Sequence, residues 1–73
     1  MEIKKGDKLK VVCRFKGTYD AVAINDFDTE KDEWASVALD QDQVIHGIIS
    51  SKRWQRGDEV PCRNSHAKIT RRK

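Results

Sequence analysis

Two cysteines and two histidines are the side chains of this chain best suited to hold a zinc ion, because thiolate and imidazole are preferred zinc ligands. They are Cys13, His46, Cys62 and His66. None of them stands in a Cys-x-x-Cys or His-x-x-x-His spacing, so a zinc site would need all four to converge from separate segments. The spacing therefore predicts neither a bound metal nor another cofactor.

A thiol paired with an imidazole, Cys62 with His66, is the best candidate for nucleophilic catalysis. Such a pair also needs a third group that orients the base, and a pocket that encloses all three. A chain of 73 residues leaves little room for that pocket, and no motif of catalytic spacing is present. We therefore expect a protein that is not an enzyme.

Basic residues interleaved with aromatic ones form the strongest chemical pattern in the chain. Lysine and arginine neutralise phosphates, and an exposed tryptophan can stack a base. The pattern predicts a domain that binds nucleic acid, RNA or DNA, with little sequence preference. The expected contact residues are Lys10, Arg14, Lys16, Lys52, Arg53, Trp54, Arg56, Arg71 and Arg72.

A simpler alternative for these residues stays open. Any amphipathic strand at the surface of a small β-protein carries charges on its outer face, and Trp54 could close one end of the core instead of facing a ligand. The burial of Trp54 separates a stacking platform from a core residue.

Acidic residues dominate the middle of the chain. Residues 20–42 hold eight acids and one lysine, a net charge of −7, whereas residues 1–19 carry +4 and residues 43–73 carry +6. The alternative function is therefore an interaction or inhibitor module, of the kind that phages and mobile elements encode. Its acidic hairpin would dock in the basic groove of a protein partner. The expected contacts are Asp26, Asp28, Glu30, Asp32, Glu33 and Trp34.

The elements that must position these side chains are organised around residues 8–16. Four apolar side chains, from Leu9 to Phe15, alternate there with four cationic ones, from Lys8 to Lys16. Successive side chains of a strand point to opposite faces, so the pattern predicts a strand with one face in the core. Further strands are expected near residues 19–27, 34–39 and 44–49, with an exposed acidic loop over 26–33. A last strand opens at residues 58–62, and residues 67–70 continue it or pair with it. One helical turn is expected within residues 50–57.

The predicted core takes one apolar face from each strand. In residues 19–27 both faces are apolar, which is typical of a strand covered on two sides. The two cysteines are expected as free thiols, because nothing in the sequence indicates export, and a contact between them would be a matter of packing. The predicted core comprises Leu9, Val11, Cys13, Phe15, Val22, Ile24, Val37, Leu39, Ile48, Val60 and Ile69.

Five short strands with one late helical turn predict a small, curved all-β barrel. Their order resembles that of SH3-like barrels, which place a single helical turn just before the last strand. The resemblance implies one five-stranded β-barrel domain over residues 1–73, with a basic C-terminal end at residues 68–73.

The OB-fold is the alternative barrel. The motifs Gly57-Asp58-x-Val60 and Ile69-x-x-Arg72 are similar to the end of S1-type and initiation-factor-type OB domains. This similarity covers less than half of the chain, and the chain lacks the helix that those domains place between their third and fourth strands. Fold alone does not fix function in either case.

No apolar run is long enough to span a membrane, and the first residues lack the apolar core of a signal peptide. We therefore expect a cytoplasmic protein without a membrane partner. A strand edge could pair with a second copy, so the expected state is a monomer or a weak homodimer.

Overall fold

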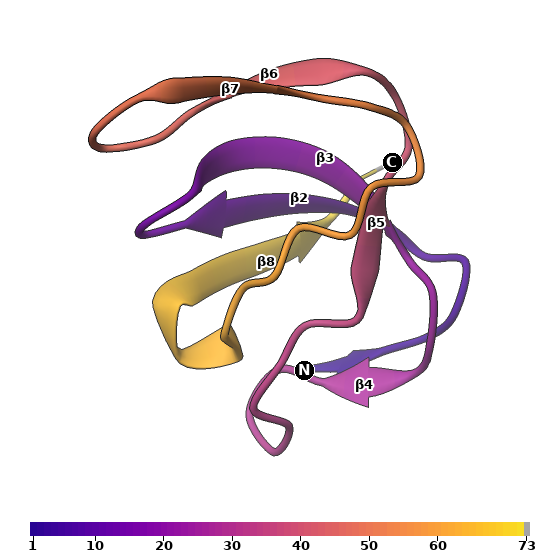
Figure 1. The fold of residues 1–73 in the computed structure, drawn as a ribbon. Helices are drawn as coiled ribbons and strands as arrows, with labels where there is room; N and C mark the ends of the chain where they lie inside the picture. The colour runs from indigo at the N-terminus through magenta and orange to yellow at the C-terminus, as the bar shows by residue number, and fades with distance from the viewer. Residues whose placement is uncertain (73) are drawn as a thin grey trace.

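The strands are short and account for most of the regular structure. The computed structural model describes residues 1–72, which contain eight strands and one 3-10 turn but no α-helix (Figure 1). The predicted all-β class is therefore confirmed. The strands are β1 (Glu2–Ile3), β2 (Lys8–Cys13), β3 (Gly17–Ala23), β4 (Phe27–Asp28), β5 (Val37–Leu39), β6 (Gln43–His46), β7 (Ser51–Trp54) and β8 (Ala67–Arg71), with the 3-10 turn at Asn64–His66.

The main sheet is antiparallel, with the strand order β5-β3-β2-β8. Its centre is β2, whose Val11 lies opposite Tyr19 on β3 and Ile69 on β8. Side chains directly opposite each other share one face of a sheet, so all three enter the core. The alternation predicted for β2 is confirmed, because Leu9, Val11 and Cys13 are buried while Lys10 and Val12 between them are exposed.

The prediction that Val22 and Ile24 form the core face of β3 is wrong. Tyr19, Ala21 and Ala23 are buried, whereas Val22 and Ile24 are only half-buried. The register explains this, because β2 places its buried residues opposite the odd-numbered residues of β3. Both faces of this segment are apolar, so the sequence pattern by itself could not decide between them.

Two other predicted core residues lie at the surface. Phe15 is 54% exposed and Ile48 is 72% exposed. The reason is that β2 ends at Cys13, which leaves Phe15 in the following turn, while Ile48 lies in the loop that joins β6 to β7. The remaining predicted core residues are buried: Val37, Leu39, Val60 and Ile69.

The helical turn predicted within residues 50–57 is also wrong. Ser51–Trp54 forms β7, which pairs with β6 in an antiparallel hairpin. The amide of Gly47 donates a hydrogen bond of 3.0 Å to the carbonyl of Ser50, which closes this hairpin. The short helical turn lies later, at Asn64–His66, directly before β8.

Three separate sheets surround the core and do not close into a continuous barrel. The β6–β7 hairpin lies along one end of the main sheet, and the small β1–β4 sheet lies at the other end (Figure 1). The chain after β7 crosses the remaining open side and buries Val60 and Cys62 against the core. In the part of the chain that the structure describes, no helix is long and apolar enough to cross a membrane.

The prediction of free thiols is wrong. Cys13 and Cys62 form a disulfide, with their Cα atoms 6.7 Å apart and a sequence separation of 49. Cys13 is the last inward-facing residue of β2, and Cys62 lies on the segment that crosses the open side. The disulfide therefore joins the main sheet to the segment that crosses the open side of the core.

Candidate nucleic-acid interface

A groove of about 540 Å³ lies between the β6–β7 hairpin and the turn that follows β2. A smaller hollow of about 170 Å³ adjoins it, because Phe15 and Lys16 line both. We call the two together the aromatic groove. Among the residues that the structure describes, no aspartate or glutamate lines either part. Its aromatic and cationic lining residues are Phe15, Lys16, Trp34, Lys52, Trp54, Arg63 and His66.

The β6–β7 register directs Lys52 and Trp54 into the groove. Lys52 lies opposite the buried Ile45, and Trp54 lies opposite Gln43, so both share the inward face of the hairpin. The Nζ atom of Lys52 lies 4.2 Å from the centroid of the Trp54 ring. Trp54 is half-buried and packs against the core, so it is both part of the core and part of the groove wall.

The turn after β2 forms the opposite wall. Its Arg14 amide donates a 2.7 Å hydrogen bond to the carbonyl of His66, and the Phe15 ring meets the His66 ring edge-on, with 4.9 Å between their centroids. Gly17 has a φ of +112°, and a Cβ at this position would lie 2.4 Å from the carbonyl oxygen of His46. A glycine is therefore needed for this turn to approach the hairpin closely.

The smaller hollow is bounded by Trp34 and Arg63. These residues form an isolated antiparallel bridge, and the guanidinium carbon of Arg63 lies 4.9 Å from the centroid of the Trp34 ring. Arg63 also forms an ion pair with Glu33, which lies outside the lining. Trp34 is 47% exposed, and this residue, which was predicted as a contact of the alternative protein partner and also as a possible stacking surface, lies on the aromatic groove.

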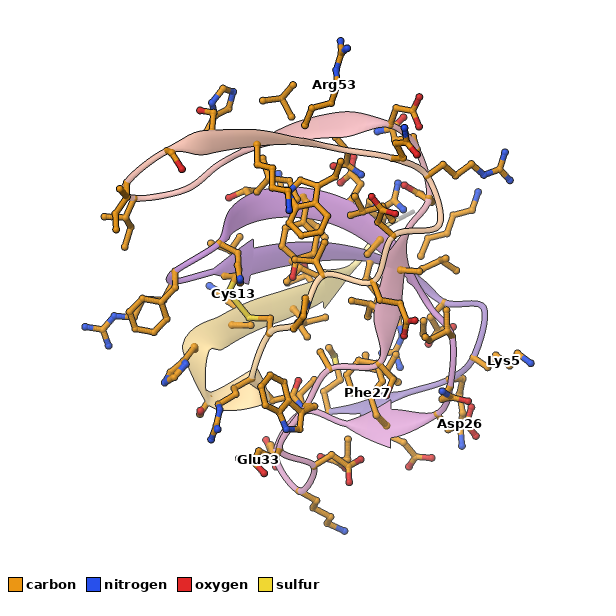
Figure 2. The ribbon with its side chains drawn as sticks, viewed as in Figure 1. Lys5, Cys13, Asp26, Phe27, Glu33 and Arg53 are labelled. Carbon is orange, nitrogen blue, oxygen red and sulfur yellow. A yellow bond between two sulfur atoms is a disulfide. The ribbon has the colours of Figure 1, made fainter. Side chains whose placement is uncertain are left out.

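Three of the predicted nucleic-acid contacts lie elsewhere. Arg53 is on the outward face of the hairpin and points away from the rest of the protein (Figure 2). Lys10 is exposed on the outer face of the main sheet, opposite Asp20. Arg56 lies in the turn beyond β7, where its amide donates a 2.8 Å hydrogen bond to Asp42. The structure thus brings Lys16, Lys52 and Trp54 together, with Arg14 beside them.

The two predicted C-terminal arginines are engaged within the protein. Arg71 forms an ion pair with Asp7, at 3.2 Å, and donates to the carbonyl of Glu2. Arg72 forms an ion pair with Asp40 and donates to two carbonyls of the main sheet. Their charges are already compensated, which leaves them less suited to bind phosphate.

The acidic hairpin of the alternative function is held by its own hydrogen bonds. Asp28 accepts hydrogen bonds from the amides of Glu30 and Lys31, at 2.8 and 3.2 Å, and these bonds, with that of Glu30 first, lower the pKa of the Asp28 carboxyl below its ordinary value. Asp32 accepts a 2.8 Å hydrogen bond from the Asp28 amide, and Asp26 accepts one from the Lys5 amide.

The rest of this hairpin is only partly exposed. Phe27 and Asp28 form β4 and pair with β1, so Phe27 is buried. Glu30 is exposed, and its carboxylate lies 3.8 Å from the N-terminal ammonium group. Glu33 forms the ion pair with Arg63 described above, and Figure 2 shows it at the end of the protein away from Arg53.

Three residues line the groove but were not predicted as site residues: Phe15, Arg63 and His66. Phe15 has the same parity as the inward-facing residues of β2, so the alternation pattern predicted it in the core and not in the groove. The following Lys16-Gly17 pair is a turn signal that could have ended the strand earlier. Arg63 and His66 carry no local signal, because their neighbours in the groove come from distant parts of the chain.

The candidate zinc ligands do not converge. The two cysteines are bonded to each other, His66 packs on Phe15, and His46 shares a 2.7 Å hydrogen bond with Ser51 on the outward side of the hairpin. Within residues 1–72, no three histidine, cysteine or acidic side chains gather as ligands of one ion.

Comparisons with known protein families, with curated proteins and with solved structures find no match to this chain. The function therefore has to be inferred from the shape, charge and side chains of the groove itself.

Proposed function

We propose that this protein is a non-catalytic domain that binds single-stranded nucleic acid, RNA or DNA, in the aromatic groove with little sequence preference. The composition of the lining carries this proposal. Three aromatic side chains and three cations line the groove without a carboxylate, although the chain contains 12 acidic residues. Grooves that hold single strands combine these two kinds of side chain.

The cationic and the aromatic side chains would contact different parts of the nucleic acid. Lys16 and Lys52 would neutralise phosphates, and Phe15 and Trp54 would stack bases. Lys52 lies over the Trp54 ring, so its move to a phosphate would uncover the ring for a base. Few hydrogen-bonding groups line the groove apart from the cations, which explains why little sequence preference is expected.

The SH3-like order is the finer assignment of the fold that we propose. Its support is the 3-10 turn directly before β8, together with the pairing of β8 with β2. The OB alternative would need a helix between β5 and β6, and residues 40–42 are too few to form one. The cytoplasmic location, and a monomer or weak homodimer as the oligomeric state, belong to the same proposal and follow from the sequence features given above.

A protein partner is the second candidate, and it is favoured by the tip of the β6–β7 hairpin. Ile48 and Ile49, which also line the larger part of the aromatic groove, are 72% and 98% exposed, and adjacent exposed isoleucines are unusual unless another surface covers them. The acidic hairpin is a weaker docking site, because most of its carboxylates are engaged by its own backbone or by Arg63. This candidate therefore has an apolar contact surface, and its partner would present apolar side chains.

A fluorescence titration with a 15-mer of oligothymidylate separates the two candidates. Both tryptophans line the groove, so a bound strand should quench their emission. The logarithm of the binding constant should fall with the logarithm of the salt concentration at a slope of about −1.4, because each of the two phosphates neutralised by Lys16 and Lys52 contributes about −0.7. The absence of quenching even at low salt would reject the nucleic-acid function.

A further inference from the structure

The disulfide lies at the floor of the aromatic groove. Cys13 and Cys62 both line the smaller hollow, although each is more than nine-tenths buried. Figure 2 shows the disulfide at Cys13. A structural disulfide is normally sealed inside a core, where reagents do not reach its sulfur atoms. This one faces a hollow of about 170 Å³, which gives a small thiol a path to it.

The charge around the hollow favours thiol chemistry. Lys16, Arg63 and His66 line it together with the two cysteines, and within residues 1–72 no carboxylate belongs to this lining. Cationic surroundings stabilise a thiolate, both as the attacking group and as the leaving group in exchange with a disulfide. The anionic thiolate of a reductant such as glutathione would also be attracted to these cations.

Few other bonds hold the segment that carries Cys62. On one side, the Leu39 amide donates to the carbonyl of Asp58, and on the other the Ala35 amide donates to the carbonyl of Cys62, at 2.9 and 3.1 Å. In the described structure, no backbone hydrogen bond joins residues 59–61 to the rest of the protein. The disulfide and the buried Val60 are therefore the main attachments of residues 59–61, whereas Arg63 is also held by its bridge to Trp34 and its ion pair with Glu33.

We propose that the Cys13–Cys62 disulfide is a thiol-exchange site whose redox state controls the groove, an inference that rests on the proposed function. The thiolate of one glutathione would attack a sulfur of the disulfide, form a mixed disulfide and release the other cysteine as a thiolate. A second glutathione would attack the glutathione sulfur of this mixed disulfide. Two electrons pass to the protein, which gains two thiols, and one glutathione disulfide is formed.

Reduction would loosen the wall formed by residues 59–62, of which Pro61 and Cys62 line the smaller hollow together with Trp34. A nucleic acid would then have to order this wall as it binds. The oxidised protein should therefore bind oligothymidylate about tenfold more tightly than the reduced protein. Because the cytosol keeps thiols reduced, oxidation would be the signal that strengthens binding.

Glutathione buffers of graded redox ratio test the proposal on the wild-type protein. Alkylation and mass spectrometry give the reduced fraction, the titration with oligothymidylate gives the affinity, and the NMR signal of the Trp34 indole reports the wall. We expect reduction in millimolar glutathione, a shifted Trp34 signal and unchanged far-UV circular dichroism. The affinity should fall about tenfold in proportion to the reduced fraction. The variant Cys62→Ser cannot form the disulfide, so it should bind oligothymidylate with the affinity of the reduced protein at every redox ratio.

Three outcomes would overturn the thiol switch: a disulfide that resists excess reduced glutathione, a chain that unfolds completely on reduction, and an affinity that is the same in both states. An oxidised protein without affinity for the oligonucleotide would instead reject the proposed function. In that case the alkylation and the Trp34 signal still decide whether thiol exchange moves the wall.

Discussion

The acidic loop of residues 26–33 and the aromatic groove each gather charge of one sign, but they compensate that charge differently. In the loop, Asp28 and Asp32 accept hydrogen bonds from the loop's own amides. In the groove, Lys52 and Arg63 lie over tryptophan rings, and Arg63 alone also has a carboxylate partner.

This difference separates charge that shapes the chain from charge that remains free for a ligand. A carboxylate that accepts two amide hydrogen bonds fixes a turn and would lose those bonds on binding a partner. A cation over an aromatic ring gains only about 0.5–1 kcal/mol at an exposed site, so it can turn to a phosphate at little cost. The loop is therefore a structural feature, and the groove is the candidate binding surface.

The groove floor depends on a covalent bond, whereas the loop depends on hydrogen bonds, so the largest effect should come from removing the disulfide. The variant Cys13→Ala/Cys62→Ala should lower the free energy of unfolding by about 4 kcal/mol, because the bond closes a loop with a sequence separation of 49. Urea denaturation followed by circular dichroism measures the change. An unchanged midpoint would show that the groove wall is held by other contacts.

Charge reversal in the groove should have the next largest effect. The variant Lys16→Glu/Lys52→Glu should weaken oligothymidylate binding on the order of 100-fold at low salt, because two phosphate contacts become repulsive. The matched control is Lys10→Glu/Lys68→Glu, which makes the same change of charge on the outer face of the main sheet. Equal losses in both variants would mean that net charge, and not the groove, governs binding.

Loss of one stacking surface should cost less. The variant Phe15→Leu keeps an apolar side chain but removes the ring, and stacking typically contributes about 1–3 kcal/mol per base. We expect about tenfold weaker binding with the salt slope unchanged, measured by the same titration. An altered slope would contradict the assignment of Phe15 to bases.

The Tyr19 hydroxyl differs from the charged groups of the loop and of the groove, because it is buried without a hydrogen-bond partner in the described structure. The Tyr19 side chain is 2% exposed and its hydroxyl makes no hydrogen bond within the described structure, and burial raises the pKa of Tyr19 to about 12. The folded state thus favours the neutral phenol, and its stability should decline as the pH rises from 10 to 12.

The variant Tyr19→Phe tests this account. It should be more stable than the wild type by about 1 kcal/mol at pH 7, because it no longer buries an unpaired hydroxyl. Its stability should also fall much less than that of the wild type between pH 10 and 12, which thermal denaturation at each pH would measure. A less stable variant would indicate that the hydroxyl has a partner, such as a bound water.

The smallest effect is expected in the acidic loop. The amide hydrogen bonds to Asp28, that of Glu30 first, lower the pKa of its carboxyl below the ordinary value of 3.8. The stability that this carboxylate contributes is present above pH 3.8 and is lost as the pH falls through the lower pKa of the folded state. The variant Asp28→Asn should therefore show a shallower loss of stability in acid, with oligonucleotide binding unchanged. Weaker binding would place the loop in the site.

Sequence alone predicted the parts of the fold that depend on one clear pattern. The alternation in β2 fixed which of its residues enter the core, since only one of its faces is apolar. On β3 both faces are apolar, so pairing with β2 had to decide. The identity of β7 likewise depends on its partner β6, because Ser51–Trp54 is too polar to show a strand pattern.

The candidate site was only partly predictable for a related reason. Lys16, Lys52 and Trp54 were predicted from residue type, and the structure places them on one groove. Arg71 and Arg72 have the same residue type, but their distant partners Asp7 and Asp40 compensate them. Such contacts between residues far apart in the sequence, like the disulfide, depend on the folded chain and leave no local signal.

NMR mapping of a bound oligonucleotide tests the central claim most directly. Amide and indole signals of the oxidised protein would be followed as a 15-mer of oligothymidylate is added at low salt. The account predicts that the largest shifts occur at Phe15, Lys16, Lys52 and the Trp54 indole, with the loop of residues 26–33 nearly unchanged. Shifts confined to that loop or to the outer face of the main sheet would contradict it.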